Sequence, residues 1–75
     1  MNTLLYKMLL SSEEADRAKS VLSLDLLGKN AVGIGDHSTG DFYKSAEEAL
    51  RMLIDADGRI EILKNEFLQM TQLNG

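Results

Sequence analysis

A heptad pattern of apolar residues in the second half of the chain constrains its fold more than any other feature. From Phe42 to Met70, apolar residues recur at alternating intervals of four and three. This spacing is typical of a helix that packs along another helix, whereas a half-buried strand would need a period of two. The pattern predicts a helix over about residues 39–72. Its interaction seam consists of Phe42, Ala46, Ala49, Leu53, Ala56, Ile60, Leu63, Phe67 and Met70.

Gly58 is the one position that could divide this helix. Asp57 and Gly58 form a dipeptide that is common in turns, so two shorter helices are an alternative. The seam, however, passes Gly58 in step and places it on the opposite side of the helix, which favours one continuous helix. On that outer side we expect a surface ladder of opposite charges spaced four residues apart, made by Glu47, Arg51, Asp55 and Arg59.

The first part of the chain predicts a second helix over about residues 3–27, capped by Thr3 and ended by Gly28 as the C′ residue. A second helix-start signal at Ser11 and Ser12 leaves open a kink near Ser11. An unbroken helix keeps six residues in a register of alternating intervals of four and three, with small side chains in the middle: Leu4, Met8, Ser11, Ala15, Ala18 and Leu22.

These elements predict an all-α protein of one domain, a two-helix hairpin with a long second helix. At 75 residues the chain buries little apolar surface, and without cysteine it has no disulfide to compensate. Leu50, Met52 and Ile54 also extend the apolar face of the long helix beyond its seam. We therefore expect a homodimer, in which two hairpins form an antiparallel four-helix bundle. Another helical protein is an alternative partner.

Composition also argues against several classes of ligand. A net charge of −4, with the cations spread along the chain, weighs against nucleic acid and anionic membranes. The apolar run of residues 1–10 contains Lys7 and is too short to cross a bilayer, so we expect a cytoplasmic protein. The lack of cysteine excludes thiolate zinc sites, and a single histidine excludes a multi-imidazole site within one chain. We expect no metal and no cofactor.

The glycine-rich connection over about residues 28–38 is the best candidate for a ligand site, through Gly33, Gly35, Asp36, His37 and Ser38. It precedes a helix N-terminus, which suits an anion. The Gly-Lys-Ser/Thr ending of a phosphate-binding loop is absent, however, and Asp36 and Asp41 would repel a phosphate. Asp36, His37 and Ser38 have the residue types of a hydrolytic triad, but adjacent residues rarely face one another.

Residues 55–60 share the alternating acids and the glycine of an EF-hand calcium loop. The comparison fails at both ends, because the first loop position would be Leu53 and the twelfth would be Lys64, where calcium needs carboxylates. Glu47, Glu48 and Asp55 lie on the outer side of the predicted helix, where they do not converge on a site. No residue is therefore predicted to be catalytic.

Two hypotheses about function follow. The first is a non-enzymatic helical protein that acts through protein–protein interaction, as a homo-oligomeric adaptor or regulatory subunit. The second is a minimal ligand-binding or catalytic protein that uses Asp36 and His37 in the glycine-rich connection.

Overall fold

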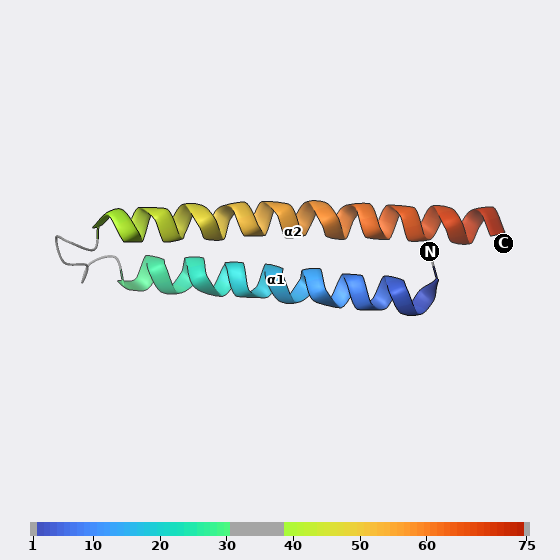
Figure 1. The fold of residues 1–75 in the computed structure, drawn as a ribbon, viewed down its shortest axis with the longest axis horizontal. Helices are drawn as coiled ribbons and strands as arrows, with labels where there is room; N and C mark the ends of the chain where they lie inside the picture. The colour runs from blue at the N-terminus through green and yellow to red at the C-terminus, as the bar shows by residue number, and fades with distance from the viewer. Residues whose placement is uncertain (1, 31–38, 75) are drawn as a thin grey trace.

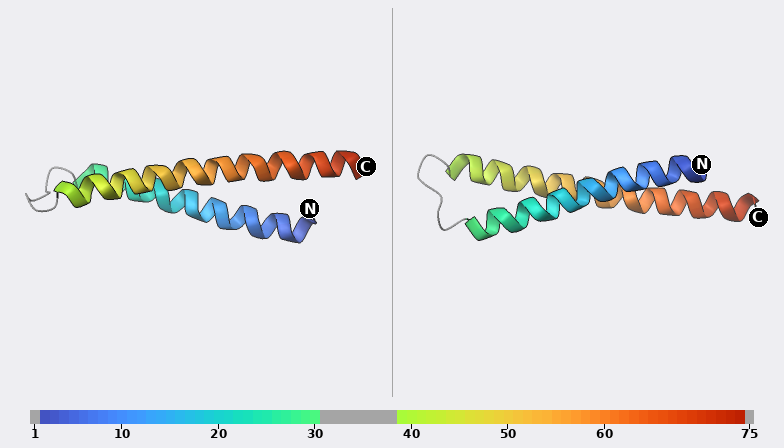
Figure 2. Two further views of the ribbon diagram at one scale, coloured as in Figure 1. Left: turned by 45° about the horizontal axis from the view of Figure 1, so that its top comes forward. Right: turned by 90° about the horizontal axis from the view of Figure 1, so that it is seen from below.

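A computed structural model of the chain, which describes residues 2–30 and 39–74, is a hairpin of two long helices. Helix α1 spans Thr3–Asn30 and helix α2 spans Thr39–Asn74. They run antiparallel and pack side by side along most of their length (Figure 1). Seen from two other directions, the helices cross one another (Figure 2). The predicted all-α hairpin is confirmed.

The first helix is one uninterrupted element that begins at Thr3, as predicted, whereas its capping residue and its C-terminal end differ from the prediction. Asn2, and not Thr3, caps it: the Asn2 side-chain oxygen accepts a hydrogen bond of 2.7 Å from the backbone N–H of Leu5. That bond satisfies one of the free N–H groups of the first turn. The helix also continues through Gly28 to Asn30, with no positive φ at Gly28, so Gly28 is not a C′ residue. Lys29 pairs with Asp25 at 2.8 Å, and its positive charge suits the end of a helix.

The second helix is continuous through Gly58, as the seam predicts. It begins at Thr39, and Asp41 in its first turn opposes the helix dipole. Of the predicted charge ladder, Glu47 and Arg51 form a pair at 3.4 Å. The expected pair between Asp55 and Arg59 is replaced, because Arg59 reaches across to Glu13 of α1.

Gly58→Ala tests the continuity of α2. Apart from the adjoining backbone of α2 itself, no atom lies within 4 Å of the position that a Cβ would take at Gly58, and the residue does not have a positive φ. The substitution should therefore stabilise the protein by roughly 0.5–1 kcal/mol, through helix propensity and a less flexible unfolded chain. Urea unfolding followed by circular dichroism measures the change. A loss of stability would show that the helix is broken at this glycine.

Candidate interaction surfaces

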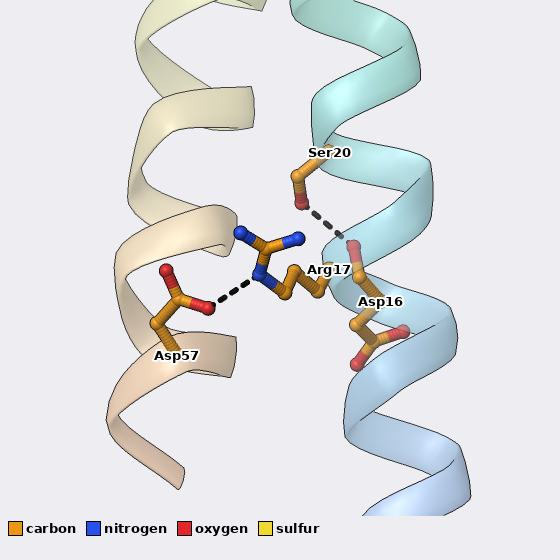
Figure 3. Close-up of polar contacts among 4 residues, drawn as sticks. All are labelled: Asp16, Arg17, Ser20 and Asp57. Atoms are coloured by element: carbon orange, nitrogen blue, oxygen red, sulfur yellow. Dashed lines mark hydrogen bonds and ion pairs between the residues drawn. The ribbon is translucent and has the colours of Figure 1, made fainter. Parts of the chain in front are cut away.

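The contact between the two helices has small residues at its centre. Among the described residues, those classed as buried are Ala49, Ala56 and Ser20, with Ala56 0% and Ser20 1% exposed. The Ser20 hydroxyl donates a hydrogen bond of 2.8 Å to the Asp16 carbonyl oxygen in its own helix, so its polar group is satisfied despite burial (Figure 3). Small side chains here allow the two backbones to approach closely.

The seam predicted for α2 lies on the side of the helix that faces α1. Its described side chains are all buried or partly buried, whereas their neighbours on α2 are exposed apart from Gly58. Near the free ends of the hairpin, Tyr6 of α1 stacks on Phe67 with ring centroids 4.1 Å apart. The side chain of Met70, the last residue of the seam, lies outside the described part of the structure.

The side of α1 that faces α2 is not the one that its apolar pattern suggests. Its less exposed residues are Tyr6, Leu9, Leu10, Glu13, Asp16, Ser20, Leu24 and Leu27. The middle of this set is polar, and apolar residues are spread around the whole helix. Hydrophobic periodicity alone therefore could not find this face. Complementary charges are the available signal. On α1 the acid Glu13 precedes Arg17, and on α2 the acid Asp57 precedes Arg59. Because the helices are antiparallel, each acid meets an arginine of the other helix.

Two ion pairs join the helices at mid-length. The Arg17 Nε donates to the Asp57 carboxylate at 2.6 Å (Figure 3), and an Arg59 guanidinium N–H lies 3.3 Å from Glu13. In the heptad of α2, Asp57 and Arg59 flank the seam on opposite sides, the usual positions of charges in paired helices.

The Arg17–Asp57 pair should contribute little to stability, because both side chains are about half exposed. In a double-mutant cycle of Arg17→Ala and Asp57→Ala, we expect a coupling energy of about 0.2–1 kcal/mol. Salt should reduce it further. Urea unfolding of the four proteins at low and high ionic strength measures this coupling, and a value well above 1 kcal/mol would contradict the expectation.

The residues from Leu4 to Leu22 that recur at alternating intervals of four and three lie on the side of α1 that faces away from α2. We call this set the outer stripe: Leu4, Met8, Ser11, Ala15, Ala18 and Leu22. All six residues are exposed, and the three large ones are 79% (Leu4), 55% (Met8) and 58% (Leu22) exposed. No charged residue occupies a position of the stripe. The 4–3 spacing continues to Asp25 and Lys29, which pair with each other and mark the end of its apolar part.

A shallow groove of about 440 Å³ lies between the helices at the connection end of the hairpin. Leu26, Leu27, Ala49 and Met52 provide its apolar lining. Its polar lining, among the residues that the structure describes, consists of Ser20, Ser23, Ser45 and Glu48.

None of the candidate ligand residues predicted in the glycine-rich connection lies in the described part of the structure. Gly33, Gly35, Asp36, His37 and Ser38 lie outside the described residues. Within residues 2–30 and 39–74, the His, Cys, Asp and Glu side chains form no group of three or more that could hold a metal ion. Over the same residues, neither helix is long and apolar enough to span a membrane.

No protein-family model matches this chain, and the searches found no similar curated protein and no similar solved structure. The fold and the surfaces of the hairpin therefore carry the argument about function.

Proposed function

We propose that this chain is a non-enzymatic helical protein that acts through protein–protein interaction, as a homodimer of two hairpins that brings four helices together. Such a protein serves as an adaptor or regulatory subunit. The observation that carries the proposal is the large apolar surface that a single hairpin leaves uncovered.

Twelve large apolar side chains are exposed in the described part of the hairpin: Leu4, Leu5, Met8, Val21, Leu22, Leu26, Tyr43, Leu50, Met52, Ile54, Ile62 and Leu68. They include Leu50, Met52 and Ile54, which the sequence suggested as an extension of the buried face. Scattered exposed apolar residues are normal, but so many on so small a chain favour an interaction surface.

The total exposed area supports the same conclusion. A compact monomer of 8.3 kDa would expose about 4,600 Å², whereas this chain exposes 5706 Å². The excess of about 1,100 Å² is comparable to the roughly 800 Å² that each partner buries in a standard interface. The molecule is also elongated, 59 × 14 × 14 Å, with a radius of gyration of 17.0 Å against about 11 Å for a compact chain of this length. A second hairpin would supply the missing cover.

The molar mass in solution tests this proposal. At micromolar concentration, light scattering coupled to size-exclusion chromatography should give twice the chain mass of 8.3 kDa. The midpoint of thermal unfolding should also rise with protein concentration, because association stabilises the folded state by mass action. A stable monomer that unfolds cooperatively, with a midpoint independent of concentration, would contradict the homodimer.

A further inference from the structure

The outer stripe differs from the other exposed surfaces of the hairpin in its lack of charge. On the two flanks, where α1 and α2 meet, the middle of the surface carries the ion pairs Arg17–Asp57 and Glu13–Arg59. A partner that covered either flank would have to desolvate one of these pairs, which costs free energy. None of the six positions of the outer stripe is charged, so a partner that covers it meets charges only at its edges.

The edges of the stripe carry complementary residues. Glu14 and Lys19 are both exposed and lie on opposite edges, five residues apart. When two identical helices pack parallel and in register, a residue on one edge of the contact faces the residue five positions later, on the other edge, of the second helix. Glu14 of each copy would then lie beside Lys19 of the other. One heptad later, Val21 and Leu26 have the same relation, and both are exposed apolar residues.

The middle of the stripe resembles the centre of the contact inside the hairpin. Ser11, Ala15 and Ala18 are as small as Ser20, Ala49 and Ala56, which bring α1 and α2 together. Leu4, Met8 and Leu22 add larger apolar side chains at the two ends.

We propose that the outer stripe is the dimer interface, and that it packs against the same stripe of a second copy with the two α1 helices parallel. This inference rests on the proposed homodimer and specifies its contact surface. The four helices then form a layer in the order α2–α1–α1–α2, which differs from the antiparallel bundle expected from the sequence, and each α2 keeps its contact with its own α1. The contact is isologous, so each substitution acts twice in the dimer.

Leu22→Asp and Ile62→Asp form a matched pair of variants that tests which face is used. Leu22 lies on the stripe and is 58% exposed, while Ile62 lies off the stripe on α2 and is 63% exposed. Each variant places a carboxylate on an exposed aliphatic position, and circular dichroism checks that both keep their helicity.

Sedimentation equilibrium should show that Leu22→Asp raises the dimer Kd by about a hundredfold or more, since two leucines leave the interface and two charges enter it. Ile62→Asp should change the Kd by less than about threefold. If Ile62→Asp dissociates the dimer and Leu22→Asp does not, the stripe is the wrong face although the homodimer stands. If the unmodified chain is a monomer, both proposals fail.

Disulfide formation gives a second test that does not depend on how well Leu22→Asp folds. The chain has no cysteine, so a single introduced thiol reports only its own surroundings. In parallel α1 helices, Ala15 faces Ala15 of the second copy at a separation that a disulfide can span. Ala15→Cys should therefore form covalent dimers on mild oxidation, and Asn65→Cys, exposed on α2, should not.

Failure of Ala15→Cys to cross-link would overturn the parallel arrangement. A mixture of Ser11→Cys and Ala15→Cys chains that forms only the mixed disulfide would place the two α1 helices antiparallel. No cross-link in any of these proteins, with a dimer still seen by light scattering, would overturn the parallel contact, and the effect of Leu22→Asp on the Kd would then show whether the stripe is used at all.

Discussion

Ile60→Asp should lower the free energy of unfolding by about 3 kcal/mol or more, a large share of the stability of so small a protein. Ile60 is a central residue of the α2 seam and is half-buried against α1. The substitution removes its apolar contacts and places a carboxylate where α1 offers no cation on the seam itself. A chain of this length has only about 4–11 kcal/mol of stability to lose.

Circular dichroism during urea titration measures the effect of Ile60→Asp. Ile62→Asp is the control, because it makes the same chemical change two residues away at a side chain that is 63% exposed. Its cost should stay within about 0.5–1 kcal/mol. Equal losses for the two variants would mean that α2 is rotated about its axis relative to the structure described above.

Ala56→Leu should cost about 1–3 kcal/mol by overpacking. Ala56 is fully buried, and its neighbour Asp57 is held to Arg17 of α1 at 2.6 Å, so the backbones cannot separate there without breaking other contacts. Adding three carbon atoms must displace α1 locally or force strained rotamers.

Gly58→Ala is the natural comparison for Ala56→Leu in urea unfolding. Both changes add carbon atoms within the same turn of α2, but the Cβ added at Gly58 would point into open space. The two variants should shift the urea midpoint in opposite directions. If Ala56→Leu also stabilised the protein, the helices would not be in close contact at this level.

The long helix was predictable because its seam is consistent along its whole length. Apolar side chains from Phe42 to Phe67 keep one spacing, so the face toward α1 and the continuity through Gly58 follow from periodicity alone. The start of α1 was harder, because Thr3 and Asn2 are both good caps and only the backbone geometry decides between them. The same holds at Gly28, where a glycine permits a helix end without requiring one.

The face of α1 toward α2 could not be predicted in this way. Its centre consists of Glu13, Asp16 and Ser20, while its more regular apolar register points to solvent in the single hairpin. A hydrophobic pattern does not identify the neighbour that covers a helix face, and on α1 the more regular pattern is not the one that meets α2. The charges at Arg17 and Glu13 carried the missing information, but they can be interpreted only once the partner helix is known.

The two interhelical ion pairs have a consequence beyond their small stability: they select one alignment of α1 along α2. If α1 slid by seven residues in one direction, the seam would still be satisfied, but Arg17 would lie opposite Lys64 and Glu13 opposite Glu66. A slide in the other direction would set the same two charges against Leu50 and Met52. The first alignment brings like charges together, and the second places charged side chains against apolar ones. Both are therefore disfavoured by residues that add little to the stability of the native alignment.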